Sequence, residues 1–164
     1  MIEFDMSQNF GTANAYTDGS FRDGIVGIGV VFEFDGKSEE MAFRIESQEL
    51  AVHRNVSGEI YAVMYAVFYA YKVKVKRLRV FHDYSGLAHW VSGEWKTKTN
   101  LTRLYKSFVE HFSNNVEIEF VKVDAHKGDV LNNLADKLAK EALEGNVFAP
   151  YFEEFAEFVN KLRK

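Results

Sequence analysis

The chain has 164 residues, of which 47% are hydrophobic and 15% are aromatic. A chain of this length and apolar content can bury one substantial core, so a single domain over residues 1–164 is expected. The chain contains no cysteine, which excludes disulfides, thiolate metal sites and a cysteine nucleophile. The formal net charge is −4, so any polyanionic partner must be bound by local basic patches.

The N-terminal segment differs from a secretory signal peptide. It carries Glu3 and Asp5 where a signal peptide has a basic segment followed by an apolar one. The longest apolar run, residues 60–71, is too short to cross a bilayer. Together with the missing cysteines, these features predict a cytoplasmic protein without a membrane segment.

Three antiparallel strands are expected in the first part of the chain, over residues 14–18, 27–34 and 37–45. The tight turn Asp35-Gly36 connects the second and third of them. The first strand is expected to end at Asp18, which places a carboxylate at the mouth of a strand. Because Asp-Gly is a common turn signal, a purely structural turn is the alternative to a catalytic role for Asp18.

A long buried helix is expected after the polar connection 46–55, with Ser57 as its N-cap. Residues 60–71 contain no polar side chain except tyrosines, so the helix should be covered on most sides. Glu59 is expected in the first turn. Its carboxylate there is either functional or only complements the helix dipole.

A second carboxylate is expected beside Asp18. Residues 76–82 alternate as a strand that ends at Asp83. A strand that follows a crossover helix runs parallel to a neighbour, most simply the first strand, so Asp83 should lie next to Asp18. Ligands bind at such a switch point of an open sheet. The alternative role for Asp83 is the N-cap of the next helix.

The last predicted helix carries a fourth acidic candidate. Asn132 and Asp136 are one turn apart on it and share a face. The alternative role for Asp136 is an ion pair with Lys140 four residues later. The remaining predicted elements are helices over 87–90, 101–112 and 130 to about 143, and a strand over 116–123.

The loop over residues 92–100 combines Trp95 with Lys96 and Lys98. This composition suits base stacking and phosphate contact, although a solvated loop anchored by Trp95 is equally compatible with it.

The tail over residues 148–164 is expected to form an amphipathic helix, with acidic side chains on the face opposite its apolar residues. It either packs on the domain as an extra helix or contacts a protein partner. The apolar residues at helical spacing are Phe148, Tyr151, Phe152, Phe155, Val159 and Leu162.

Taken together, the acidic motifs resemble ribonuclease H type 1, and the likeness is greatest to its bacterial members. The resemblance covers roughly residues 14–143. It implies the α/β ribonuclease H-like fold, in which helices flank a five-stranded mixed sheet of three antiparallel and two parallel strands. The catalytic core would span about 14–144 and the helical extension about 148–164. The matching residues are Thr17-Asp18-Gly19-Ser20, Asn55-Val56-Ser57-Gly58-Glu59, Asp83, His126 and Asn132-Asn133-Leu134-Ala135-Asp136.

The resemblance implies an endonuclease that hydrolyses the RNA strand of RNA/DNA hybrids and leaves 5′-phosphate and 3′-hydroxyl ends. Two Mg²⁺ ions, or Mn²⁺ in their place, would be held by Asp18, Glu59, Asp83 and Asp136. In this scheme Asp18 bridges the two ions, Glu59 and Asp83 hold the ion nearer the leaving group, and Asp136 holds the ion that carries the water. Hard oxygen ligands without cysteine suit these cations.

The resemblance also implies further site residues. His126 would shuttle a proton or aid product release, and an ordinary surface histidine is the alternative. The expected substrate-binding residues are Ser20, Arg54, Asn55, Trp95, Lys96 and Asn132.

Two features depart from the family pattern. Little of the chain precedes the first strand, so no separate N-terminal hybrid-binding domain is expected, and only Lys96 and Lys98 stand where many relatives carry a strongly basic protrusion. Hybrid binding should therefore be weak and dependent on salt.

Two other functions stay open. The first is a related carboxylate-cluster nuclease, such as a junction resolvase or an integrase core, against which the His126 loop and segment 55–59 argue. The second is a non-catalytic hybrid-binding module, which the presence of all four acidic residues disfavours.

Overall fold

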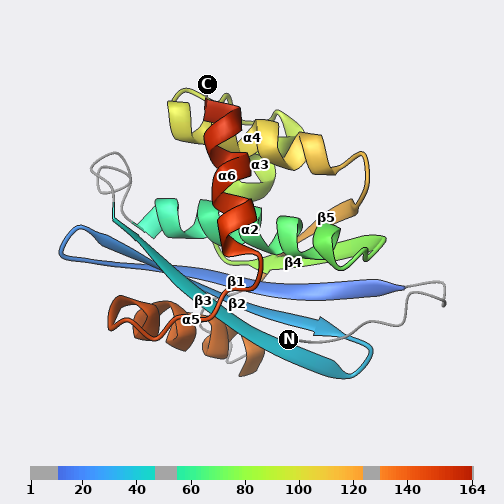
Figure 1. Ribbon diagram of the computed structural model, residues 1–164. Coiled ribbons are helices and arrows are strands. Elements are labelled where there is room, and N and C mark those ends of the chain that lie inside the picture. Colours follow the sequence, from blue (N-terminus) through green and yellow to red (C-terminus); the bar gives the residue numbers. More distant parts are fainter. Residues whose placement is uncertain (1–10, 47–54, 124–129, 164) are drawn as a thin grey trace.

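A five-stranded mixed sheet in the order β3-β2-β1-β4-β5 forms the centre of the computed structural model, which describes residues 11–46, 55–123 and 130–163 (Figure 1). The first three strands pair antiparallel, whereas β4 runs parallel to β1 and β5 runs parallel to β4. This is the predicted topology. The strands are β1 (Thr12–Arg22), β2 (Ile25–Phe34), β3 (Lys37–Glu46), β4 (Arg77–His82) and β5 (Glu117–Lys122).

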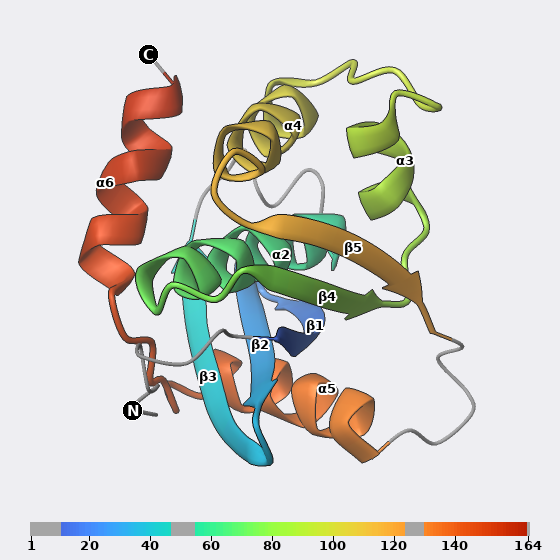
Figure 2. The same ribbon diagram turned by 90° about the vertical axis from the view of Figure 1, so that its right-hand side faces the viewer.

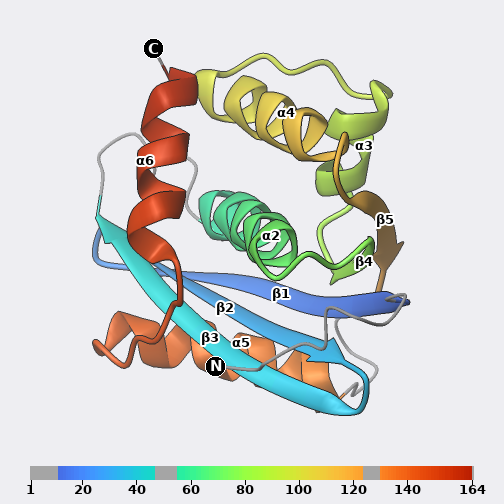
Figure 3. The same cartoon turned by 45° about the vertical axis from the view of Figure 1, so that its right-hand side comes forward.

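Helices cover both faces of the sheet. On one side α2 lies against the sheet with α3, α4 and α6 beyond it, and α5 packs on the other side against β1, β2 and β3 (Figure 3). Figure 2 shows α4 between α3 and α6. Among the helices of the described ranges, none has the length and apolarity that a bilayer span requires. The helices are α2 (Asn55–Lys72), α3 (Gly86–Ser92), α4 (Asn100–Phe112), α5 (Val130–Leu143) and α6 (Phe152–Arg163).

The core is built around α2. Every residue from Ser57 to Ala70 is buried, because the helix lies between the sheet and the outer helices. This explains its unbroken apolar run. The helix begins at Asn55, three residues before Gly58, which an N-cap at Ser57 would make its first residue, so Ser57 is a buried residue of the first turn and not the N-cap. Glu59 is correspondingly the fifth residue of the helix and lies outside the first turn.

Strand β1 is longer than predicted. It continues through Asp18 to Arg22 because it stays paired with β2, with Asp18 opposite Gly29. The hairpin turn is Asp23-Gly24, where both φ angles are positive, at 52° and 79°. The parallel pairing of β1 with β4, by contrast, ends at Tyr16 and Phe81. Asp18 therefore lies just beyond the point where the parallel neighbour of β1 stops, and not at a strand end or a turn.

The segment between β4 and α4 also differs in detail from the prediction. The N-cap position of α3 is Ser85, so Asp83 does not cap this helix. Thr99 caps α4 through a reciprocal pair of hydrogen bonds with Thr102, at 3.0 Å and 3.1 Å between backbone nitrogen and hydroxyl oxygen. This capping box fixes the loop 93–99 to the start of α4.

The C-terminal segment is part of the core, as the predicted extra helix requires. Phe148 and Ala42 exchange two backbone hydrogen bonds of 2.9 Å, and the Tyr65 hydroxyl donates to the Pro150 carbonyl at 2.7 Å. Helix α6 then buries Phe155 and Val159. It begins at Phe152, after a single bridge between Phe148 and β3 and a turn at Pro150-Tyr151.

Candidate metal centre

Three carboxylates from separate elements meet at one point. One oxygen atom of each of Asp18, Glu59 and Asp83 lies within 4.8 Å of the other two. Asp18 is on β1, Glu59 is on α2, and Asp83 directly follows β4. The crossover through α2 makes β4 a parallel neighbour of β1, and this arrangement brings residues distant in sequence to the same place.

Two glycines next to these carboxylates set the distance between β1 and α2. A Cβ atom on Gly19 would lie 2.5 Å from the carbonyl carbon of Gly58, and one on Gly58 would lie 2.7 Å from the Cα atom of Gly19. Neither position can carry a side chain unless the backbones separate. Since Gly19 follows Asp18 and Gly58 precedes Glu59, this contact determines how close the two carboxylates come. The glycines belong to the motif residues, but sequence reasoning did not identify their contact.

The electrostatics of the cluster favour protonation when no cation is bound. Burial raises the pKa of Glu59 well above its usual value, and the nearby Asp18 and Asp83 raise it further. Burial also raises the pKa of Asp18 to about 6, although hydrogen bonds from Glu59 and from the Gly19 backbone N–H oppose the shift. The Gly19 N–H donates to Oδ1 of Asp18 at 2.8 Å.

The donor set fits a hard divalent cation. All three ligand atoms are carboxylate oxygens, which Mg²⁺ and Mn²⁺ prefer. Oε2 of Glu59 is buried and has no hydrogen-bond partner among the described residues. A buried polar atom of this kind carries a desolvation cost that a bound cation would remove.

Asp136 lies near this cluster but outside the group of three. Its Oδ2 atom is 3.0 Å from Nζ of Lys140, so the predicted i,i+4 ion pair is present. The position of α5 keeps Asp136 close: a Cβ on Gly29 would lie 2.2 Å from the Ala135 carbonyl oxygen, and Gly29 is opposite Asp18. The negative charge of Asp136 accordingly contributes to the raised pKa of Asp18. All four carboxylates were expected to converge. In the structure three of them meet, and the fourth, Asp136, is paired with Lys140 instead.

The structure places the other predicted residues as follows. Ser20 lies two residues beyond Asp18 on β1 and so shares its face, and Asn132 is buried on α5. Asn55 is the first residue of α2. Arg54 and His126 lie outside the described residues, so their predicted roles stay predictions.

An aromatic cluster flanks the carboxylates at α3. The Trp95 ring centroid lies 5.9 Å from that of Trp90, 6.4 Å from that of Tyr84 and 5.0 Å from that of His89. Trp95 is 40% exposed, and it lines a surface hollow with Trp90, Lys96 and Lys98. Sequence reasoning identified Trp95 but missed Tyr84 and Trp90, whose contact with it depends on how the loop folds back onto α3.

The RNase H family model matches residues 11–144, which is most of the chain. The chain belongs to the RNase H family. Membership confirms the predicted enzyme class, the ribonucleases H that act on RNA/DNA hybrids. The match ends before α6, so this helix lies outside the part that the RNase H family shares.

Solved structures of type 1 ribonucleases H share the fold. RNase H1 of the halophilic archaeon Halobacterium salinarum NRC-1 has a TM-score of 0.68 and 22% identity, covering 82% of this chain and 99% of that chain. The N-terminal RNase H domain of rv2228c from Mycobacterium tuberculosis has a TM-score of 0.65 and 20% identity, with coverages of 82% and 94%. LC11-RNase H1, isolated from compost and solved in complex with an RNA/DNA hybrid, has a TM-score of 0.62 and 20% identity, with coverages of 80% and 99%. No curated protein sequence matches this ribonuclease H.

Proposed function

We propose that this ribonuclease H cuts the RNA strand of RNA/DNA hybrids endonucleolytically with two divalent cations and leaves 5′-phosphate and 3′-hydroxyl ends. The observation that carries the proposal is the meeting of Asp18, Glu59 and Asp83 within 4.8 Å. The solved complex of LC11-RNase H1 with an RNA/DNA hybrid supports the substrate class, since that protein has the same fold.

The residues that would hold the cations follow from their positions. Asp18 lies within 4.8 Å of Glu59 and Asp83 and is also affected by the charge of Asp136, so Asp18 would be the residue that helps to hold both cations. Glu59 and Asp83 would serve the cation at the leaving oxygen, and Asp136 the cation at the attacking water. Bound there, two divalent cations would activate the water and stabilise negative charge on both oxygens of an in-line displacement.

The chain itself orients these ligands. The Gly19 N–H holds one oxygen of Asp18, and the burial of Glu59 keeps its carboxylate away from solvent. Lys140 pairs with Oδ2 of Asp136, so Asp136 would use its other oxygen or give up this ion pair to become a ligand. We propose that His126 transfers a proton at the product end of the reaction, for which the ordinary pKa of histidine near 6.5 is suitable.

Substrate contacts are proposed at three places. The exposed Trp95 ring would stack on the nucleic acid while Lys96 and Lys98 contact phosphates. Ser20 and Asn132 flank the carboxylates, and Arg54 with Asn55 at the start of α2 would hold a phosphate. Discrimination of RNA from DNA would come from contacts to 2′-hydroxyl groups across the wide minor groove of the hybrid.

A cleavage assay tests the proposal. An RNA/DNA hybrid labelled at the RNA 5′ end should be cut at internal positions with Mg²⁺ or Mn²⁺, whereas single-stranded RNA, duplex DNA and a four-way junction should stay intact. The RNA products should accept nucleotides at their 3′ ends, because these ends carry hydroxyl groups. Cleavage that continues in excess chelator would contradict the two-cation mechanism, and cleavage of the junction alone would indicate a resolvase.

A further inference from the structure

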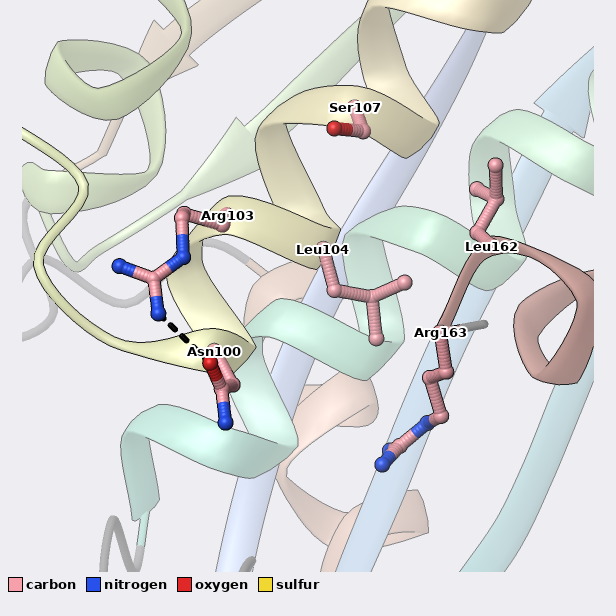
Figure 4. A pocket seen from close by; sticks show the side chains of 6 residues that line it. All are labelled: Asn100, Arg103, Leu104, Ser107, Leu162 and Arg163. Atoms are coloured by element: carbon pink, nitrogen blue, oxygen red, sulfur yellow. Dashed lines mark hydrogen bonds between the residues drawn. The ribbon is translucent and has the colours of Figure 1, made fainter.

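A polar hollow of about 330 Å³ lies between α4 and α6 (Figure 4). Helix α6 lies beyond the residues that match the RNase H family, so this hollow depends on the C-terminal extension. Figure 4 shows Leu104 between the Asn100–Arg103 pair and Arg163, with Leu162 next to Arg163 on α6. The residues that line it are Asn100, Arg103, Leu104, Ser107, Leu162 and Arg163.

The hollow is basic although the chain as a whole is acidic. Two of its lining residues, Arg103 and Arg163, are guanidinium groups from different helices, and none of the described residues that line it is acidic. The formal charge of this lining is therefore +2, in a chain whose net charge is −4. Such a local reversal of sign favours an anionic ligand.

Both guanidinium groups are held in place by neighbours. Nη2 of Arg103 donates to Oδ1 of Asn100 at 2.6 Å, and Nη2 of Arg163 donates to the Tyr61 hydroxyl at 2.6 Å. A guanidinium carries five N–H donors, so the contact with Asn100 leaves Arg103 able to bind an anion with its remaining donors. Because the side chains are already positioned, binding would cost less conformational entropy.

Helix α4 adds further groups that suit an anion. Asn100 is its first residue, so the positive end of the helix dipole lies at this side of the hollow. Ser107 presents a hydroxyl group one turn beyond Arg103 on the same helix. Among anions, phosphate matches the planar fork of an arginine, which can donate two parallel hydrogen bonds to it.

We propose that this hollow binds a phosphate group of the nucleic-acid backbone, beyond the contacts made by Lys96 and Lys98. The inference rests on the proposed function for its substrate. The loop that carries the two lysines leads directly into Asn100, so basic groups continue from the loop onto α4 and then onto α6. The C-terminal extension would thus lengthen the substrate-binding surface of a ribonuclease H with few basic residues in its loop.

The first experiment measures hybrid binding without cleavage. The affinity for a fluorescently labelled hybrid is measured by anisotropy in chelator over a range of salt concentrations. Arg103→Gln and Ser107→Asp should each weaken binding several-fold at low salt. Arg103→Gln should also reduce the slope of log K against log salt by about 1, the value for one lost phosphate contact. The matched control is Arg79→Gln, which removes an exposed arginine paired with Glu119 on the sheet.

A second measurement separates the two possible sources of the phosphate. Inorganic phosphate is titrated into wild type and Arg103→Gln, and the backbone amide signals of Ser107 and Leu162 are followed by NMR. A salt slope for the hybrid that is reduced by about 1 in Arg103→Gln, with Arg79→Gln unchanged, supports the proposal. An unchanged slope with saturable phosphate binding means a site for a free phosphate compound and overturns the assignment to the hybrid.

The remaining outcomes are also decisive. If neither the salt slope nor the amide signals respond, the hollow binds no anion and the inference is wrong. Ser107→Asp changes an exposed residue, so it tests the site without relying on the contact between Arg163 and Tyr61. Failure of the wild type to cut any hybrid would instead count against the proposed function, while the phosphate titration would still decide whether the hollow is an anion site.

Discussion

Asp18 is the residue on which the candidate site depends most. Glu59 and Asp83 place carboxylate oxygens within 4.8 Å of it, and Asp136 adds a further negative charge nearby. Like charges about 4 Å apart repel by roughly 1 kcal/mol or more in a partly screened site. Without a cation, the group that is most useful for binding metal is therefore also a source of instability.

We predict that Asp18→Asn abolishes cleavage but stabilises the metal-free protein by roughly 1 kcal/mol, because one repelling charge is removed while the shape is kept. Urea melts of wild type and variant at pH 7 with chelator measure this difference. Saturating Mg²⁺ should reduce the difference in stability between variant and wild type, since the cation binds only the native wild-type cluster. A variant that is less stable than wild type by more than about 1 kcal/mol would identify Asp18 as mainly structural.

The stability of the metal-free protein should also depend on pH through the ionisation of Asp18. The pKa of Asp18 is raised from 3.8 to about 6 in the folded protein, so folding favours its protonated form. Stability of the metal-free wild type should fall as pH rises from about 4 to above 6, relative to Asp18→Asn, because the folded carboxylate must ionise in its buried position. Melts of both proteins in chelator at several pH values give the difference curve. A flat difference curve would show that the pKa of Asp18 is not raised.

At the scale of elements, the contact between β1 and α2 decides the geometry of the site. Gly19 and Gly58 touch through their backbones, and each is bonded directly to one of the candidate ligands. A helix of ordinary residues would lie farther from the strand. The separation of Asp18 from Glu59 is thus a property of the packing of two elements and not of the carboxylates alone.

We predict that Gly58→Ala lowers cleavage at least tenfold and raises the Mg²⁺ concentration needed for half-maximal activity. Alanine is about 1 kcal/mol better than glycine in a helix interior, but a Cβ 2.7 Å from the Gly19 Cα forces the elements apart at a typical cost of 1–3 kcal/mol. Metal titrations of activity measure the effect. Gly11→Ala is the matched control, because a Cβ there meets nothing within 4 Å. Wild-type metal dependence in Gly58→Ala would show that the contact does not position the ligands.

Helix α6 supports the core from outside the family region. Phe155 is 1% exposed, and its ring centroid lies 5.5 Å from that of Tyr65 and 5.8 Å from that of Phe68. We predict that Phe155→Ala lowers the free energy of unfolding by about 3–5 kcal/mol, from lost burial and the cavity left behind. Phe148→Ala removes the same side chain where it is 51% exposed and should cost less than about 1 kcal/mol. Denaturant melts of the two variants compare them directly, and equal losses would contradict a core role for α6.

The elements show what the sequence could predict and what it could not. The structure confirms the predicted antiparallel pairing of the first three strands, the parallel position of β4 beside β1, the buried α2 and the turn at Asp35-Gly36. The predicted end of β1 was wrong, because pairing with β2 continues the strand past Asp18 to the next turn signal. The predicted start of α2 was also wrong, because Ser57 is a buried residue inside the first turn and is not the N-cap.

The site shows the same limit. The acidic residues were predictable from the resemblance to a known family and from the crossover topology. The ion pair that holds Asp136 aside and the contact of Trp95 with Tyr84 were not, since both depend on side-chain positions across elements.

At the scale of the whole molecule, charge is distributed unevenly. The net charge is −4, yet Lys96 and Lys98 line one hollow and two arginines line another. If the two proposals hold, nucleic-acid contacts should be concentrated on the side formed by α3, α4 and α6. Few phosphate contacts are available, so binding should be weak. Because these contacts supply most of the affinity, added salt should remove most of it.

We predict that Lys96→Ala and Lys98→Ala each raise KM for a hybrid several-fold with little change in kcat, because they contact phosphates away from the reacting bond. Steady-state kinetics at two salt concentrations measure the effect. Lys137→Ala, which removes an exposed lysine of α5 paired with Glu141, is the control and should behave as wild type. If KM and its salt dependence are unchanged in both loop variants, the loop does not bind the substrate.

The order of α2 and α6 along the chain also determines when the core can be completed during synthesis. Tyr61, Tyr65 and Phe68 on α2 are made before Phe155, which covers them and is synthesised only after β5 and α5. Until then an aromatic face of the central helix is exposed to other nascent chains and to chaperones. Completion of the core must therefore wait until α6 has left the ribosome, and ribosome-bound chains halted before Phe155 should be digested by protease much faster than the released protein.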